Sequence, residues 1–179
     1  MVADLDRQSS VSGSKKPTWR SIFKTGNLVK SGSGYLVSWD TDVELTTQLG
    51  EAGRGLELSE LVTFQGKLLT FDDRTGLVFE IDRQHQCVPR YILTEGDGST
   101  PKGQKSEWAT VKDGKLFVGS FGKEYTNNDG SIKNRWNMWA KTIDASGKVT
   151  HVDWTPYYEK IRECRARTPS AVRLPPRAR

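Results

Sequence analysis

Two stretches of the sequence, SELVTFQGKLL at residues 59–69 and SEWATVKDGKLF at residues 106–117, repeat each other with one residue inserted before the Gly-Lys-Leu turn. The period lies in the high forties, which is typical of the blades of a β-propeller. Equivalent positions of successive blades converge on the central axis. Glu60 and Glu107, which match in the repeat, are therefore expected to lie close together, and converging carboxylates indicate a metal ion.

Short β-prone runs occur in sets of four, separated by turns rich in Gly, Asn and Asp. They predict an all-β chain with about three four-stranded blades, at residues 18–50, 59–95 and 106–155. A wide loop is expected at residues 125–130, because Asn and Gly tolerate positive φ. The expected strands of the first blade are residues 19–25, 28–30, 35–40 and 43–48. Together the blades predict a partial propeller domain over residues 1–163.

The pattern changes after residue 154. Pro156, which is tolerated in a first helical turn, precedes helix formers at residues 157–162 and predicts a short helix. From residue 164 onward the chain consists mainly of Arg, Pro, Ala, Ser and Thr, with few apolar residues to offset the entropy of ordering. A disordered basic tail is therefore expected at residues 164–179.

The net charge of +5 is concentrated at the C-terminus. Five arginines follow Glu163 with no acidic residue among them, so residues 1–163 are neutral. The Lys and Arg of this body alternate with Asp and Glu, which is typical of a solvated surface and argues against nucleic acid as a partner. No apolar run is long enough to span a bilayer, so no membrane partner is expected.

Neither the cysteines nor the histidines form a recognisable site. Cys87 and Cys164 lack the spacing of a metal or redox motif, and His85 and His151 lack partners at ligand or triad spacing. The first residues contain neither a basic nor an apolar segment of a signal peptide. The sequence leaves two alternatives: a cytosolic chain or one whose natural start is missing.

Several motifs occur in a fixed order: VADLD (2–6), GRGLELSEL (53–61), DDRTG (72–76), GDG (96–98), KSEW (105–108) and GKE (122–124). In order and spacing they resemble the calcium-activated nucleotidases, the apyrase family of vertebrates and blood-feeding insects. The resemblance implies a five-bladed propeller that binds Ca²⁺ on its axis and hydrolyses nucleoside di- and triphosphates, many members preferring UDP or GDP. It covers about residues 1–163, the first half of such an enzyme, and so implies a truncated propeller.

Carried onto this sequence, the resemblance implies that Ser59, through its main-chain carbonyl, and Glu107, through its carboxylate, bind calcium, with Glu60 beside them. Calcium takes roughly six to eight oxygen ligands, so a mixed set of this kind suits it. The remaining ligands would come from later blades. The alternative for either glutamate alone is an exposed carboxylate at the end of a strand.

The same resemblance implies a nucleotide cleft lined by polar side chains. Phosphoanhydride hydrolysis needs a carboxylate to orient water and cations to hold phosphate. The candidate catalytic residues are Asp73, Glu57 and Asp4, and the candidate substrate-binding residues are Arg74, Asp6, Lys105, Lys123 and Tyr125. Tyr125 replaces a tryptophan that the family usually has, which puts the substrate preference in doubt. Without the family, DDRTG would be interpreted as an ordinary hairpin turn.

Two functions from different classes remain. The first is a Ca²⁺-dependent nucleoside diphosphatase, whose isolated 179-residue chain is expected to have little or no activity. The second is a non-catalytic propeller fragment that acts as a binding module, or a non-functional truncated product. Open blade edges favour self-association. The resemblance implies a location in the secretory lumen or outside the cell, which no signal or anchor in the sequence supports.

Overall fold

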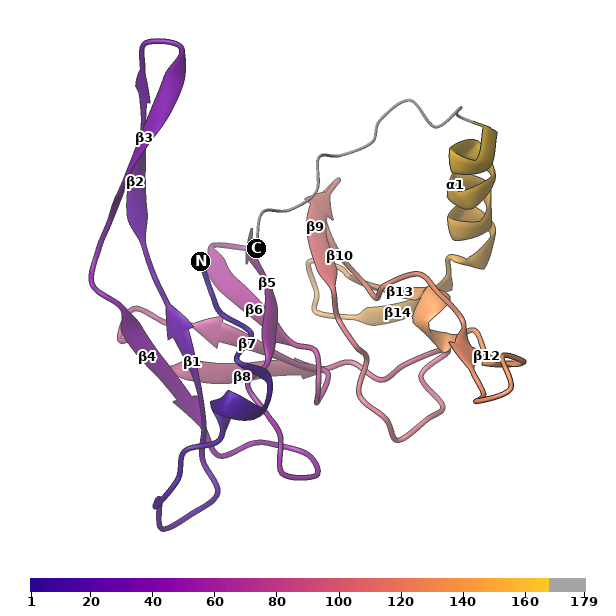
Figure 1. The fold of residues 1–179 in the computed structure, drawn as a ribbon, viewed down its shortest axis with the longest axis horizontal. Helices are drawn as coiled ribbons and strands as arrows, with labels where there is room; N and C mark the ends of the chain where they lie inside the picture. The colour runs from indigo at the N-terminus through magenta and orange to yellow at the C-terminus, as the bar shows by residue number, and fades with distance from the viewer. Residues whose placement is uncertain (168–179) are drawn as a thin grey trace.

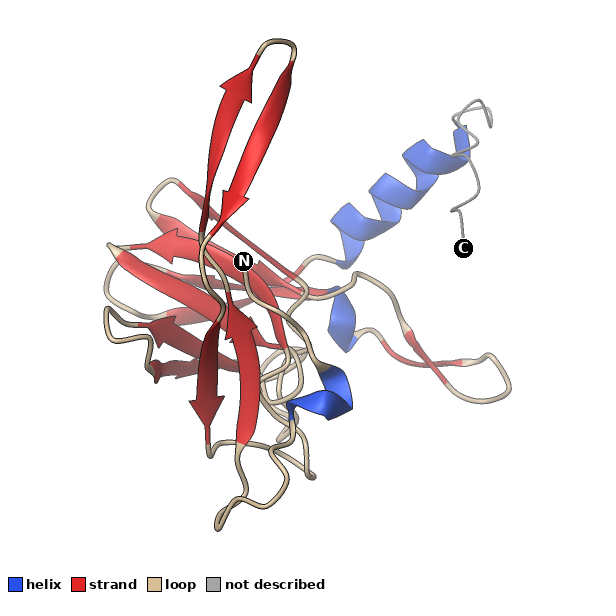
Figure 2. Ribbon diagram, turned by 60° about the vertical axis from the view of Figure 1, so that its left-hand side comes forward, coloured by secondary structure: helices blue, strands red, loops and turns tan. Residues whose placement is uncertain are grey.

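The computed structural model describes residues 1–167, which form several small antiparallel β-sheets and one α-helix (Figures 1 and 2). The expected all-β class is thereby confirmed. The largest sheets are two four-stranded sheets that follow each other along the chain.

The central sheet contains β5 (Leu58–Phe64), β6 (Lys67–Asp72), β7 (Leu77–Ile81) and β8 (Cys87–Ile92) in sequential order. Each strand pairs with the next, as expected for the second four-stranded unit. A bulge in β5 lies between Leu58, which pairs with Asp72, and Glu60, which pairs with Phe71. The extra residue is Ser59, and a bulge of this kind leaves such a residue outside the ladder.

The next sheet contains β9 (Trp108–Lys112), β10 (Lys115–Gly119), β13 (Trp139–Ile143) and β14 (Val149–Asp153). Its strands are also in sequential order, as expected for the third four-stranded unit. The long excursion between β10 and β13 holds the small ribbon of β11 (Tyr125–Thr126) and β12 (Ile132–Asn134), followed by the 3-10 turn η2 (Trp136–Met138).

The first predicted unit is wrong as a four-stranded blade. β1 (Trp19–Phe23) pairs with β4 (Val43–Thr47), and β2 (Gly26–Ser31) pairs with β3 (Gly34–Trp39). These are two separate two-stranded pairs. All residues of β2 and β3 are exposed, and both views show this ribbon projecting away from the sheets (Figures 1 and 2).

The four strands do not form one blade because only the turn between β2 and β3 reverses the chain. The other two turn signals mark a bend where one long hairpin changes direction. At this bend the Thr25 hydroxyl donates to the Asp40 carboxylate at 2.6 Å, and Lys24 pairs with Asp42 at 2.7 Å. At this point the Gly and Asp residues bend both arms of one long hairpin. They do not reverse the chain to form the additional hairpins that the sequence predicted.

The buried side chains form two clusters, one on each face of the central sheet. Side chains alternate along a strand, so Phe79 and Val78 of β7 belong to opposite clusters. The first cluster packs the central sheet against β1 and β4, and the second packs it against the sheet of β9, β10, β13 and β14. Within residues 1–167 no sheet closes on itself, so a five-bladed ring remains a prediction.

The C-terminal helix α1 (Thr155–Arg167) is longer than predicted. The tail is expected to begin at residue 164, but residues 164–167 continue the helix, because no proline or glycine occurs between Pro156 and the end of α1 at Arg167. The Tyr158 hydroxyl receives a 3.0 Å hydrogen bond from Trp108 Nε1, which fixes the helix against β9. The rest of the predicted tail, residues 168–179, lies outside the described residues. No helix within residues 1–167 has the length and apolarity needed to cross a membrane.

Candidate active site

Several of the predicted site residues are brought together at one edge of the central sheet. The start of β5 lies beside the end of β6, because Leu58 pairs with Asp72 in the antiparallel ladder. β5 also neighbours β9, and the Ser59 hydroxyl donates to the Ser106 carbonyl between them. Residues just before β5, just after β6 and just before β9 therefore meet at this edge.

Asp72 organises the backbone of the edge. This fully buried carboxylate accepts hydrogen bonds from the amides of Leu56, Glu57 and Arg74, at 2.8, 3.3 and 3.0 Å. The bond to Leu56 helps to hold that residue at a φ of 55°, an uncommon conformation for a residue with a side chain. The DDRTG segment is thus a turn, as its sequence predicts, and it also fixes the residues on either side of β5 and β6.

Lys105 bridges two of the predicted carboxylates, and we call Asp73, Lys105 and Glu107 the lysine bridge. Lys105 Nζ pairs with Asp73 Oδ2 and lies 2.9 Å from Glu107 Oε1. The Asp73 side chain is only 6% exposed, whereas those of Glu107 and Lys105 are 34% and 40% exposed. One end of the bridge is therefore shielded from solvent and the other is accessible.

Burial raises the pKa of Asp73 to about 6, although the hydrogen bond from Lys105 opposes the shift. The negative charges of Asp4 and Glu107 raise this pKa further. Burial alone would lower the pKa of Lys105, but its hydrogen bonds to both carboxylates outweigh that effect and raise it. A carboxyl group that titrates near neutral pH beside a fixed cation is suited to general-base chemistry.

A second group, the arginine cluster, contains Asp4, Asp6, Arg54 and Glu57. Arg54 Nε donates to Glu57 Oε1 at 2.7 Å, and its Nη2 also bonds Glu57 and lies 3.3 Å from Asp6 Oδ1. The Glu57 side chain is only 2% exposed, so this two-pronged contact supplies its counter-charge. Carboxylate oxygens of Asp4, Asp6 and Glu57 all lie within 4.8 Å of one another.

Arg54 is a site residue that the sequence analysis did not predict. It lies in the quoted GRGLELSEL motif, three residues before Glu57. A carboxylate at the start of an apolar strand needs a cation if it is buried, and Arg54 is the nearest one in the sequence. The need of a buried Glu57 for a nearby cation is the sequence signal that points to Arg54.

The lysine bridge and the arginine cluster act on each other electrostatically. Asp4 raises the pKa of Asp73, and Asp73 contributes to the raised pKa of Arg54. A cavity of about 530 Å³ adjoins the arginine cluster and is lined by Asp4, Leu5, Asp6, Arg7, Gln8 and Arg54. The two groups thus form one charged edge beside an open, polar cavity.

The other predicted ligands have contacts of their own. The Glu60 carboxylate accepts a 2.8 Å hydrogen bond from the amide of Leu61, and the Glu60 carbonyl accepts one from Thr70 Oγ1. Ser59 occupies the bulge of β5. The two repeats meet through the hydrogen bond between Ser59 and Ser106, while the proximity of Glu60 and Glu107 stays a prediction.

Three predicted substrate-binding residues lie outside both groups. Arg74 Nε lies 3.1 Å from Glu51 Oε2, and Lys123 is exposed. Tyr125 contacts Lys102, whose ammonium lies 4.4 Å from the ring centroid and also bonds the phenol oxygen. None of these contacts involves the lysine bridge.

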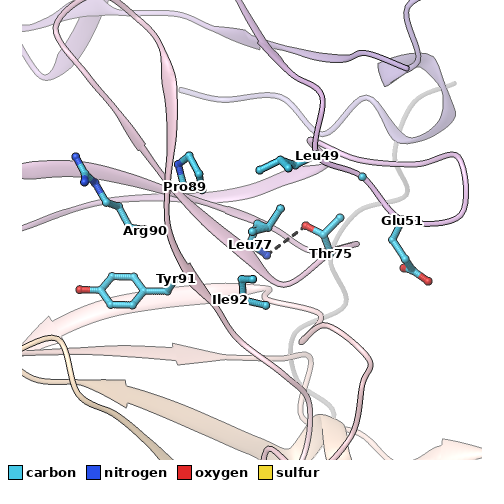
Figure 3. Close-up of a pocket in the computed structure, with 9 residues that line it drawn as sticks. Leu49, Glu51, Thr75, Leu77, Pro89, Arg90, Tyr91 and Ile92 are labelled. Carbon is cyan, nitrogen blue, oxygen red and sulfur yellow. Dashed lines mark hydrogen bonds between the residues drawn. The ribbon is translucent and has the colours of Figure 1, made fainter. Parts of the chain in front are cut away.

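A second cavity of about 530 Å³ is mostly apolar and is shown in Figure 3. Leu77, Pro89 and Ile92 contribute to its wall from β7 and β8, while Leu49 comes from the segment after β4. Its few polar groups include Glu51, the partner of Arg74. Apart from that link it contains none of the predicted carboxylates.

Comparison with known proteins identifies the chain's relatives. A sequence profile described as Apyrase matches residues 5–170. An apyrase of Cimex lectularius is 48% identical over 165 residues, which cover 90% of this chain and 45% of the relative. Soluble calcium-activated nucleotidase 1 of Rattus norvegicus is 43% identical, and the match covers 90% of this chain and 40% of the relative. Apyrase apy-1 of Caenorhabditis elegans is 39% identical, and the match covers 90% of this chain and 45% of the relative.

The chain therefore spans less than half the length of each of these relatives. The matched region contains nearly all of the lysine bridge and the arginine cluster, with only Asp4 outside it. With a family profile that matches most of its length, the chain belongs to the apyrase family.

Proposed function

We propose that this chain carries part of the active site of a calcium-dependent nucleotidase. It would hydrolyse the terminal phosphoanhydride of nucleoside diphosphates such as UDP, GDP and ADP to give the monophosphate and phosphate. Membership of the apyrase family supports nucleotide hydrolysis in general, and the name of the rat relative includes calcium activation.

The observation that carries the proposal is the shielded carboxylate of Asp73. Its pKa of about 6 leaves it mostly ionised at neutral pH yet basic enough to accept a proton from an attacking water. Lys105 keeps the carboxylate in place through its ion pair. Hydrolysis needs an oriented water of this kind, since the phosphoryl group itself requires positioning and charge neutralisation.

Cations on this edge would hold the phosphate oxygens. Lys105 is 40% exposed and has three donors, so it can contact a phosphate while it remains beside Asp73. In the arginine cluster, Arg54 holds Glu57 and Asp6, and we propose that Glu57 and Asp4 shape the neighbouring wall of the cleft. Arg74, Lys123 and Tyr125 remain candidates for contacts to the rest of the nucleotide.

The donor set of the edge fits calcium. The groups that would hold the ion are the Ser59 carbonyl, in the bulge of β5, and the carboxylates of Glu107 and Glu60. All are hard oxygen donors, which Ca²⁺ prefers, and no Cys or His occurs among them. When bound, calcium would neutralise negative charge on the phosphate oxygens.

The 179-residue chain by itself is proposed to have little or no turnover. Its relatives are more than twice the length that the match covers, and further oxygen ligands for the metal would come from the remainder.

Phosphate release from UDP, GDP and ADP by the purified chain, with Ca²⁺ and with a chelator, tests the proposal. Slow release that requires calcium and disappears in Asp73→Asn would support a catalytic edge. Release that is equal in Asp73→Asn, or that persists in chelator, would contradict it. The control Asp113→Asn changes an exposed carboxylate in the turn between β9 and β10 and should leave any release unchanged.

A further inference from the structure

Glu107 is at once a proposed ligand of the metal and a partner of Lys105. Lys105 Nζ lies 2.9 Å from Glu107 Oε1, while the same ammonium pairs with Asp73. One lysine side chain therefore connects the proposed metal ligand with the proposed general base. This inference rests on the proposed function, because it concerns the use of the same site.

The two ends of the lysine bridge differ in accessibility. The Asp73 side chain is 6% exposed and its carboxylate has lost most of its hydration, so it depends on Lys105 for a counter-charge. Glu107 is 34% exposed and can be solvated or bind another cation when Lys105 leaves it. The contact with Asp73 is therefore the more persistent one, and the contact with Glu107 is the exchangeable one.

A divalent cation and an ammonium group compete for the same carboxylate. Both positive charges would lie within a few ångströms of each other, where their repulsion is strong in a partly shielded site. Lysine has a flexible stem, so its ammonium can turn away without rearranging the backbone. Each of its three donors can find a new acceptor.

We propose that Lys105 is a tethered counter-cation for the metal site. It neutralises Glu107 in the absence of calcium and releases it when calcium binds. It then remains on Asp73 with donors that are free for a substrate phosphate. Through Lys105, calcium binding at Glu107 thus frees hydrogen-bond donors for a substrate phosphate.

Calcium binding to the 179-residue chain, measured by isothermal titration calorimetry with CaCl₂ alone, tests the inference without any hydrolysis. Lys105→Gln removes the competing charge and should bind Ca²⁺ about tenfold more tightly than the wild type. Lys105→Arg retains a cation and should stay close to the wild-type affinity. Lys112→Gln makes the same charge change at the exposed far end of β9 and should have no effect.

Several results would overturn the inference: equal or weaker calcium binding by Lys105→Gln, an equal gain in Lys112→Gln, or no calcium binding by any of these proteins. If Lys105→Gln does not fold, as judged by circular dichroism, Lys105→Met keeps the aliphatic stem and carries the same expectation. A chain that shows the predicted affinities, but whose phosphate release is equal in Asp73→Asn or persists in chelator, would contradict the proposed hydrolysis and leave the role of Lys105 supported.

Discussion

At the scale of single residues, the charged edge combines buried carboxylates with cations that reach them from more exposed positions. Asp73 and Glu57 are both shielded, and each has one basic partner, Lys105 or Arg54. Because a buried charge is costly without a partner, each pair can be tested through stability even where no activity is measurable.

Replacement of Asp73 by Asn should stabilise the chain at pH 7.5 and have little effect at pH 4. The folded-state pKa of Asp73, about 6, lies above the ordinary value of an aspartate. Between pH 4 and pH 6 the unfolded chain therefore loses this proton while the folded chain retains it, and the unfolding free energy falls as pH rises. Asn mimics the protonated form and removes this loss, which amounts to about 3 kcal/mol.

Urea unfolding at both pH values measures the difference in unfolding free energy between Asp73→Asn and the wild type. Because the other titrating groups are the same in both proteins, this difference reports on Asp73 alone. The stability gain should be larger at pH 7.5 than at pH 4. A gain that is the same at both values, or a loss at pH 7.5, would show that the folded-state pKa of Asp73 is not raised.

Removal of Arg54 should destabilise the fold because it leaves Glu57 buried without a cation. We expect Arg54→Met to lower the unfolding free energy by about 2–3 kcal/mol, less than for a fully buried pair because Arg54 is 33% exposed. The double variant Arg54→Met/Glu57→Gln should recover a large part of this loss in chemical denaturation.

Arg20→Met is the matched control for this prediction. Arg20 pairs with Glu44 in a contact whose side chains are 41% and 52% exposed, and such a pair contributes little. Equal losses in Arg20→Met and Arg54→Met, or no recovery in the double variant, would contradict a structural role for the pair of Arg54 and Glu57.

At the scale of elements, strand patterns predicted β5–β8 and the four strands β9, β10, β13 and β14 well, because each reversal is made by residues that favour turns. Gln65 and Asp113, for example, adopt positive φ in two of these turns. The small ribbon of β11 and β12 was predicted only as a loop. The segment β1–β4 was predicted as a four-stranded unit, but it forms one bent hairpin. Gly, Asn and Asp occur both where a chain bends and where it reverses, so the sequence alone does not distinguish the two cases.

The same limit applies to the site. The family resemblance implied Asp73, Lys105 and Glu107 as site residues, and the structure does bring them together. The resemblance could not show that Lys105 bridges the other two, because that depends on how β5, β6 and β9 lie side by side. Nor could it exclude Tyr125 from the charged edge, since its distance from the edge is set by the long excursion between β10 and β13.

The packing of α1 depends on the lack of a side chain at Gly119. A Cβ at Gly119 would lie 2.1 Å from ring atoms of Trp108, and that indole donates a hydrogen bond to Tyr158 of the helix. Gly119→Ala should therefore displace Trp108 and weaken the attachment of α1, with a loss of about 2 kcal/mol or more in unfolding free energy.

Gly34→Ala is the control in thermal and urea unfolding. A Cβ at Gly34 would meet no heavy atom within 4 Å, so this variant should be nearly neutral. Hydrogen exchange should also show faster exchange in residues 155–167 of Gly119→Ala. Unchanged stability and exchange would mean that α1 does not depend on the position of Trp108.

At the scale of the whole molecule, the ribbon of β2 and β3 and the outer strands leave apolar groups and strand edges uncovered in residues 1–167. Leu28, Val37 and Trp39 lie on one face of the ribbon, because Leu28 pairs with Val37 and Trp39 pairs with Gly26. All three are about half exposed or more. Exposed apolar strands with free edges favour pairing with other chains.

We therefore predict that the isolated chain self-associates as its concentration rises. Leu28→Ser/Val37→Ser should weaken this association in analytical ultracentrifugation, because both changes reduce the apolar face of the ribbon. Ile132→Ser, at another exposed apolar position in β12, should have little effect. A wild-type chain that stays monomeric at every concentration, or an equal effect of Ile132→Ser, would contradict this prediction.

We expect the edge formed by the lysine bridge and the arginine cluster to bind the phosphates of a nucleotide in the presence of calcium. Nuclear magnetic resonance of the isotopically labelled chain tests it most directly, with CaCl₂ and a UDP analogue whose bridging oxygen is replaced by methylene. We expect the largest amide shifts at residues 54–57, 72–73 and 105–107, and we expect these shifts to be lost in chelator. Shifts concentrated around Leu77 and Ile92 in the apolar cavity, or no shifts at all, would contradict it.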